Sequence, residues 1–303
     1  TTRDGSDETI AGDLSGLTSR VVVGARLGDY ELEHHLGAGA MGEVFLTHRA
    51  DAEPRALKVL SEVQGARLYR FKREFRALAD VRHDNLIALD ELVVLPDNRA
   101  FFTMEFVDGV PFVDYVRGET PRGQLPNLTR LERALRQLVE GVHHLHLARC
   151  VHRDLKPSNV LVTREGRVVI LDFGLVSELA EGDQHEGAHP HDGALMGTPA
   201  YMAPEQTGLE PTGPEADFYA LGIMLFECLT GALPFSGSIV NILLSKREGE
   251  VPDPRARLAT GVTITERVAV LCELSRRAMN PEPAQRPGAK EFLALLGEPA
   301  SAL

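Results

Sequence analysis

The 303-residue sequence predicts an α+β fold in which a strand-rich region with one helix is followed by a mainly helical region. Three observations predict this. From Tyr30 onward, apolar residues alternate with polar ones, which is typical of strands with one buried face. From Leu131 to Leu145, apolar residues recur at helical spacing instead. Residues 217–230 are apolar almost all round, as in a helix at the centre of a domain.

The composition is that of a globular protein, with 43% hydrophobic and 25% charged residues. The 32 basic and 44 acidic residues give a net charge of -12, which argues against nucleic-acid binding. Cys150, Cys228 and Cys272 lie in apolar contexts, so we expect reduced thiols. No apolar run reaches membrane-spanning length and no signal-peptide pattern is found. We therefore expect a cytoplasmic protein with no membrane segment in this chain.

Residues 1–28 are rich in Thr, Ser, Asp and Gly and show no sustained periodicity. Such a composition buries little apolar surface, so we expect a disordered or loosely docked N-terminal arm. The chain does not begin with Met. We therefore allow for a flanking regulatory domain or a partner outside it.

A glycine-rich stretch follows the first predicted strand and reads G-x-G-x-x-G-x-V, with glycines at Gly37, Gly39 and Gly42 and the valine at Val44. Because glycine has no Cβ, this backbone can approach a phosphate closely. Dinucleotide-binding folds use a similar string, but there it opens a helix. Here a β-rich run follows, and the next strand-like run carries Lys58.

Further elements are predicted from periodicity and turn signals. They are an amphipathic helix over 68–79, strands over 86–95 and 99–106, and a hairpin over 160–171. The amphipathic helix has Glu74 in its middle. A capping box at Thr129–Glu132 predicts the start of the long helix that follows.

Two short motifs supply reactive groups. They are His152-Arg153-Asp154-Leu155-Lys156-Pro157-Ser158-Asn159 and Asp172-Phe173-Gly174. The carboxylate of Asp154 can accept a hydroxyl proton, and the ammonium of Lys156 can neutralise charge on a phosphate. Oxygen atoms of Asn159 and Asp172 are ligands that Mg²⁺ prefers. Together these groups are the equipment of phosphoryl transfer.

In this order the motifs resemble those of the eukaryotic-type Ser/Thr protein kinases, over residues 30–296. Residues 39–44 and 203–206 are most similar to the bacterial eukaryotic-like members. The resemblance implies a bilobal protein-kinase fold, with a five-stranded antiparallel sheet and one helix over 29–107 and a mainly helical lobe over 108–303. It also implies transfer of the γ-phosphoryl of ATP, with Mg²⁺, to Ser or Thr hydroxyls of proteins, including the chain itself.

The resemblance further implies a role for each site residue. The implied catalytic residues are Asp154, Lys156, Lys58, Glu74 and Thr198, and the implied metal ligands are Asn159 and Asp172. Asp154 would be the base, and Glu74 would orient Lys58 onto the phosphates. The implied nucleotide-binding residues are Leu36, Gly37, Gly39, Gly42, Val44, Ala56, Lys58, Met104, Glu105, Val107 and Leu161. Met104 would be the gatekeeper, and the main chain of Glu105 and Val107 would bind adenine.

Other residues are implied to be structural. Asp217 would cap the backbone of the 152–159 loop, and Arg286 would pair with Glu205. Pro111 lies where many relatives carry a polar ribose contact, so that contact is in doubt. The histidines within 143–146 and 182–193 are interpreted as packed or solvated, with metal binding as the alternative.

Two other functional classes are weighed against this one. A pseudokinase-like nucleotide-binding scaffold would have lost a catalytic residue, and none is lost here. A small-molecule kinase of the same fold would lack the Ala203-Pro204-Glu205 peptide platform, which is present.

Two expectations concern phosphorylation of the chain itself. The hydroxyls of residues 1–28 belong either to a solvated tail or to a target of autophosphorylation. The resemblance implies an activation segment over residues 175–201. Within it, residues 178–197 contain no Ser, Thr or Tyr, and Ser177 and Thr198 lie at the two ends of this run, so we expect that phosphorylation of the segment does not activate the protein. Arg153 would pair with such a phosphate. Without a phosphate, we expect one of three alternatives. The segment stays mobile, it is ordered by a partner or flanking domain, or a carboxylate such as Glu186 or Asp192 pairs with Arg153.

Overall fold

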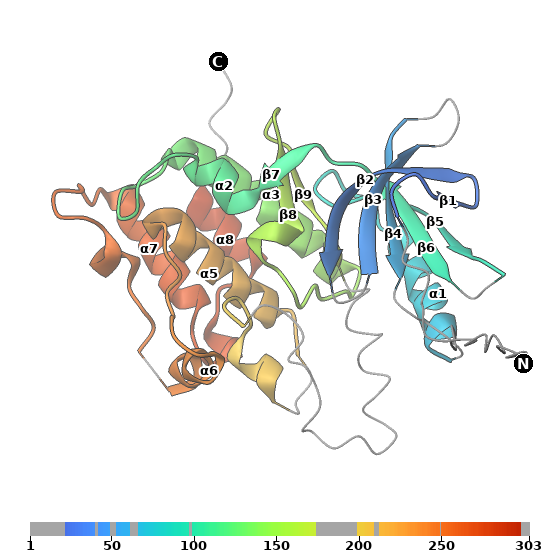
Figure 1. The fold of residues 1–303 in the computed structure, drawn as a ribbon. Helices are drawn as coiled ribbons and strands as arrows, with labels where there is room; N and C mark the ends of the chain where they lie inside the picture. Colours follow the sequence, from blue (N-terminus) through green and yellow to red (C-terminus); the bar gives the residue numbers. More distant parts are fainter. Residues whose placement is uncertain are drawn as a thin grey trace, which may run out of the picture.

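The structure is a computed structural model, and it describes residues 22–39, 42–48, 53–60, 66–96, 99–173, 199–208, 212–248 and 250–297. A sheet-rich lobe and a helical lobe lie side by side (Figure 1). The predicted α+β class and the bilobal arrangement are therefore confirmed.

The first lobe is built on an antiparallel sheet whose six described strands follow the order β1-β2-β3-β4-β6-β5. They are β1 (Arg26–Leu27), β2 (Tyr30–Gly39), β3 (Gly42–His48), β4 (Arg55–Leu60), β5 (Leu89–Val94) and β6 (Ala100–Glu105). The prediction of five strands is wrong, because β1 pairs with the start of β2. Leu27 is buried beside Tyr30 and Phe101. The sheet therefore begins before the predicted boundary at residue 29.

Helix α1 (Ala66–Ala79) packs against this sheet through aromatic side chains. The rings of Phe71 and Phe75 lie 6.1 Å and 5.5 Å from the ring of Phe102 on β6. Figure 1 shows the helix beside the sheet. The predicted amphipathic helix is confirmed, and it begins two residues earlier than its apolar pattern indicates.

The second lobe combines a three-stranded sheet with helices. The sheet holds β7 (Gly109–Pro111), β8 (Val160–Thr163) and β9 (Val168–Ile170), in that order. The helices are α2 (Phe112–Arg117), α3 (Leu128–Leu147), α5 (Glu215–Thr230), α6 (Ile239–Glu248), α7 (Glu266–Ala278) and α8 (Ala289–Leu296). The β8–β9 pair confirms the predicted hairpin.

Helix α3 begins earlier than the sequence pattern indicates. Its N-cap is Asn127, whose Oδ1 accepts a hydrogen bond from the main-chain N–H of Arg130 at 2.9 Å. The capping box predicted at Thr129–Glu132 is therefore wrong, because Asn127 already supplies the acceptor. Glu132 instead forms an ion pair with Arg267 of α7.

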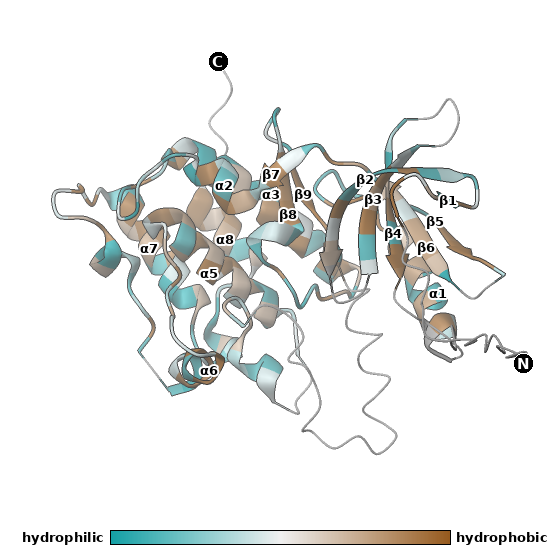
Figure 2. Ribbon diagram, in the orientation of Figure 1, coloured by the Kyte–Doolittle hydropathy of each residue, from teal (hydrophilic) through white to brown (hydrophobic). Residues whose placement is uncertain are grey.

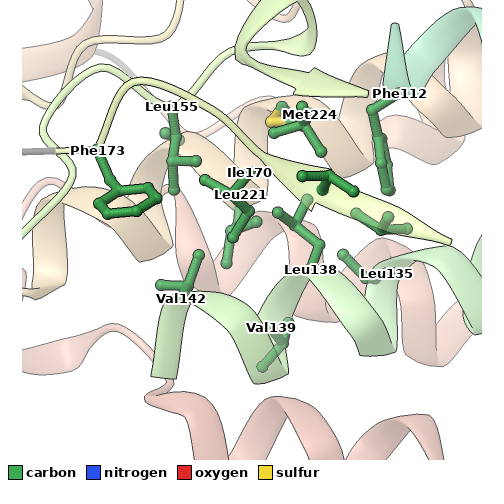
Figure 3. Close-up of a cluster of buried hydrophobic side chains, with 14 of the residues drawn as sticks. Phe112, Leu135, Leu138, Val139, Val142, Leu155, Ile170, Phe173, Leu221 and Met224 are labelled. Atoms are coloured by element: carbon green, nitrogen blue, oxygen red, sulfur yellow. The ribbon is translucent and has the colours of Figure 1, made fainter. Parts of the chain in front are cut away.

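The core of the second lobe lies between α3, α5 and β9. Helix α5 is buried nearly all round and is largely brown in Figure 2. Figure 3 shows Leu138 and Val142 of α3 near Ile170 and Leu221, with Phe173 and Leu155 at one end of the same cluster. Burying one such side chain is worth roughly 1.5–3 kcal/mol. Phe173 and Leu155 belong to the two reactive motifs, so this core anchors both.

Candidate active site

The loop over residues 152–159 is held by a carboxylate of α5. Asp217 is 1% exposed and accepts hydrogen bonds from the main-chain N–H groups of His152 at 2.9 Å and Arg153 at 2.8 Å. It also contacts Nε2 of His146 at 2.8 Å. Arg153 has a φ of 65°, which is uncommon for a residue with a Cβ. The predicted cap is present, and it stabilises a loop that contains a strained residue.

Two polar side chains of this loop converge on the carboxylate of Asp154. Lys156 Nζ donates to Asp154 Oδ2 at 2.8 Å. Asn159 Nδ2 donates to the same oxygen at 3.0 Å and to the main-chain oxygen of Asp154 at 2.9 Å. Bonds to a charged acceptor are stronger than neutral ones, so they fix the orientation of the carboxylate. Because the nitrogen of Asn159 faces Asp154, Oδ1 is the atom that it can offer to a cation.

Asp172 lies two residues after the end of β9 and pairs across the lobes with Lys58 of β4. The distance from Lys58 Nζ to Asp172 Oδ1 is 2.7 Å, and Lys58 is only 6% exposed. Asp172 has a φ of 53°, so its backbone is held in the sparsely populated left-handed region. Glu74 lies on α1 and makes an ion pair with Arg73 at 3.5 Å. The predicted pairing of Lys58 with Glu74 stays a prediction.

Two hydrogen bonds join the 152–159 loop to Leu171, the residue between β9 and Asp172. The main-chain N–H of Leu171 donates to the oxygen of Asn159 at 2.8 Å. His152 Nε2 lies 2.8 Å from the oxygen of Leu171, and the N–H of Asp154 donates to His152 Nδ1 at 3.3 Å. This network assigns the proton of His152 to Nε2. The structure thus brings Asp154, Asn159 and Asp172 to one site.

The glycine-rich stretch forms the ends of β2 and β3, where Gly39 pairs with Gly42. Gly42 has a φ of 138°, and a Cβ there would lie 1.7 Å from the carbonyl oxygen of Val59. Only glycine fits at this position. A strand follows the glycines, which agrees with the phosphate-binding strand–turn–strand and not with a dinucleotide-binding helix.

The predicted adenine site lies where β6 leads into the second lobe. Met104 and Ala56 are buried, Val44 and Leu161 are half-buried, and Leu36 is 45% exposed. Ala56 lies opposite Met104 in the sheet register. These positions are compatible with the predicted apolar contacts to a ring.

One main-chain group of Glu105 is already occupied, which limits the groups that can bind adenine. Its N–H donates to the oxygen of Ala88 at 2.9 Å. The carbonyl of Glu105 and the N–H of Val107 are therefore the groups that we expect to face adenine. Pro111 ends β7 and is the N-cap of α2.

Sequence reasoning missed two polar residues that connect parts of this site. Arg167 at the β8–β9 turn forms an ion pair with Glu105 and donates from Nε to the oxygen of Asp84 at 2.8 Å. Gln206 Nε2 donates to the oxygen of Arg153 at 2.7 Å, while its Oε1 accepts from the N–H of Ala203 at 2.7 Å. Glu105 and Arg167 lie 62 positions apart. No local pattern could have signalled these pairs.

The predicted pair between Glu205 and Arg286 is present. Arg286 Nη1 and Nη2 lie 2.6 Å and 2.8 Å from the two carboxylate oxygens of Glu205. The guanidinium also lies 4.9 Å from the ring centroid of Tyr219 on α5. This planar, two-point pairing connects residues 204–207 to the base of the second lobe.

Several predictions concern residues outside the described ranges. Thr198, the hydroxyl-rich arm before residue 22 and the histidines within 182–193 are among them. Across the described residues, no group of three or more His, Cys, Asp or Glu side chains is arranged to hold a metal ion. His146 contacts Asp217, and His144 lies 4.8 Å from His83 between ring centroids, so both are packed as interpreted.

Residues 30–295 match the family described as the protein kinase domain. This chain belongs to the protein kinase family. Serine/threonine-protein kinase Pkn1 of Myxococcus xanthus is 33% identical to this kinase domain over 273 residues, which cover 88% of this chain and 37% of Pkn1. Serine/threonine-protein kinase PrkC of Bacillus subtilis is 30% identical over 241 residues, covering 78% of this chain and 36% of PrkC.

The kinase domain also has solved structural relatives. The crystal structure of the Mycobacterium tuberculosis PknI kinase domain matches it with a TM-score of 0.65 and 25% sequence identity, covering 93% of this chain and 100% of that one. The chain spans just over one third of the length of Pkn1 and PrkC. Protein kinases use ATP and a divalent metal. Within the described residues, no helix has the length and apolarity needed to cross a membrane.

Proposed function

We propose that this chain transfers the γ-phosphoryl of ATP, with Mg²⁺, to Ser or Thr hydroxyls of proteins, including hydroxyls of the chain itself. The observation that carries the proposal is that Lys156 and Asn159 both lie within 3.0 Å of Asp154, while the main chain of Asn159 is bonded to Leu171, which directly precedes Asp172. Because ATP is the donor, we propose the cytoplasm as the place of action.

Each residue has a task in this reaction. Asp154 accepts the proton of the acceptor hydroxyl, and Lys156 neutralises charge that develops on the transferred group. Lys58 contacts the phosphates, and Glu74 is the residue that we propose orients it. The glycine hairpin covers the phosphates with main-chain N–H groups. Thr198 is proposed to act beside Asp154 and Lys156.

The residues present fit a hard cation. Asp172 and Asn159 offer oxygen donors at one site, and Mg²⁺ is commonly held by one or two protein ligands together with substrate phosphates. Bound there, the metal would neutralise phosphate charge. The buried ammonium of Lys58 is paired with Asp172 and favours the charged form of this carboxylate, which is the form that binds a cation.

The test is to incubate the purified protein with ATP, Mg²⁺ and dephosphorylated casein, and to map phosphorylated residues by mass spectrometry. We expect phosphate on Ser and Thr of casein, and on the arm that precedes residue 22. Binding of ATP without transfer to either protein would favour the pseudokinase-like scaffold. Phosphate on Tyr alone would contradict the Ser/Thr assignment.

A further inference from the structure

Lys246 of α6 is a buried lysine to which the reaction described above gives no role. It is 1% exposed, although other residues of the same helix, including Val240 at 64%, face solvent. Its Nζ donates to three main-chain oxygens, those of Pro199 and Ala200 at 2.8 Å and that of Met202 at 2.7 Å. An ammonium has three N–H donors, so the three carbonyls satisfy it completely.

Two aromatic rings also lie close to the ammonium of Lys246. Nζ lies 5.4 Å from the ring centroid of Tyr219 and 5.8 Å from that of Phe235. Among the described residues, Lys246 has no ion pair with Asp or Glu. Arg286 lies over the same Tyr219 ring and forms an ion pair with Glu205. A buried ammonium is costly unless it is hydrogen-bonded, so these carbonyls are what keeps it in place.

The segment that Lys246 holds, residues 199–203, is tied to the catalytic loop at its other end. Gln206 accepts from the N–H of Ala203 and donates to the oxygen of Arg153, next to Asp154. Tyr201 donates its hydroxyl to Glu227 of α5 at 2.6 Å. Segment 199–203 therefore connects α6 to the neighbourhood of Asp154. The acceptor protein must present its hydroxyl at Asp154, the proposed base.

We propose that Lys246 is a positioning residue that shapes segment 199–203 for the acceptor protein, and so sets the affinity for that substrate and not for ATP. This inference rests on the proposed kinase function. The three carbonyls come from residues 199–202, and a single three-donor group binds all of them at once. A neutral amine has only two N–H donors, so it would leave one carbonyl without its partner.

The protonation state gives the inference a second readout. Burial lowers the pKa of Lys246 to about 7. Because the folded-state pKa is lowered, the ammonium and its third hydrogen bond are present below that pH and are lost as the pH rises through it. The KM for the acceptor protein should then rise above neutral pH, while the KM for ATP stays flat.

The first experiment compares Lys246→Met with Lys246→Arg and with Lys290→Met, which alters an exposed lysine of α8. With dephosphorylated casein as acceptor, Lys246→Met should raise the KM for casein by about tenfold or more, since hydrogen bonds to a charged group are removed. The KM for ATP and the rate of ATP hydrolysis without acceptor should stay within about twofold of the wild type. Lys246→Arg should restore part of the casein affinity. Equal changes in both KM values, or no change in either, would overturn the proposal.

Two further measurements test the inference in other ways. The first needs no variant, and the second needs no enzymatic activity. If Lys246→Met does not fold, the pH profile of the wild type is the test. Because the pKa of Lys246 is about 7, a KM for casein that stays constant between about pH 6 and 9 would refute the inference. Hydrogen exchange of segment 199–203 should accelerate in Lys246→Met and not in Lys290→Met. This readout does not depend on phosphoryl transfer. Unchanged exchange would refute the role of Lys246, whereas an inactive wild type would refute the proposed function.

Discussion

At the scale of single residues, the site depends on carboxylates whose orientation is fixed by neighbouring side chains. Asp154 is oriented by Lys156 and Asn159, and Asp172 is paired with Lys58. The sequence motifs predicted which groups would meet, because each motif carries its reactive residues within one short loop. They could not predict that Lys58 would pair with Asp172, since the two residues lie 114 positions apart.

Asp172→Asn is expected to weaken Mg²⁺-dependent ATP binding by about tenfold or more, because a charged metal ligand becomes neutral. Titration with ATP in the presence of Mg²⁺ and again in excess EDTA would measure this. The loss should be confined to the Mg²⁺ series. Asp80→Asn, at an exposed position after α1, is the matched control. Equal Mg²⁺-ATP affinity for wild type and Asp172→Asn would remove Asp172 from the metal site.

At the scale of elements, the reactive loops are positioned by buried helices. Helix α5 is apolar nearly all round, so its burial was predictable from the sequence. Its single deeply buried carboxylate, Asp217, is where the helix meets the loop. Boundaries were less predictable. Asn127 caps α3 in place of the Thr129 capping box. Asn and Thr are both common N-cap residues, and the backbone conformation decides which of two nearby candidates serves as the cap.

Asp217→Ala should destabilise the protein by roughly 2–5 kcal/mol, because the N–H groups of His152 and Arg153 would lose their buried acceptor. Thermal and urea unfolding would measure the change. Asp217→Asn keeps one acceptor oxygen and should lie between wild type and Asp217→Ala. Asp80→Ala should have almost no effect. A free energy of unfolding for Asp217→Ala within 0.5 kcal/mol of the wild type, about the scatter of surface changes, would contradict this role.

At the scale of the whole molecule, the two lobes are joined by ion pairs, beside the site where we propose that the nucleotide binds. Lys58 reaches Asp172, and Glu105 of β6 reaches Arg167 of the second lobe. The two-lobe arrangement was predictable, because the strand-rich and helical patterns occupy separate stretches of the chain. The sixth strand and the buried Lys246 were not, because a two-residue strand and a lone lysine leave no periodic signal.

Regulation is also a property of the whole chain. Since residues 178–197 of the expected activation segment (residues 175–201) contain no Ser, Thr or Tyr, activity should not depend on phosphorylation of this segment. Treatment with a phosphatase, its removal and an assay on casein would test this. The rate should be the same whether or not mapping finds phosphate on Ser177 or Thr198. A rate that collapses and returns only with phosphate on Ser177 or Thr198 would show that the expectation is wrong.

The central claim is that Asp154 serves as the base in phosphoryl transfer to a protein hydroxyl. The most direct measurement is the rate of transfer from ATP to casein by wild type and by Asp154→Asn, with ATP affinity measured on the same samples. Asp154→Asn should lower the rate by about 10²–10⁴-fold, the usual contribution of a positioned proton acceptor. ATP affinity should stay within about twofold, because the carboxylate is bonded to Lys156 and Asn159 and not to the adenine region. Retention of more than half of the wild-type rate would contradict the claim.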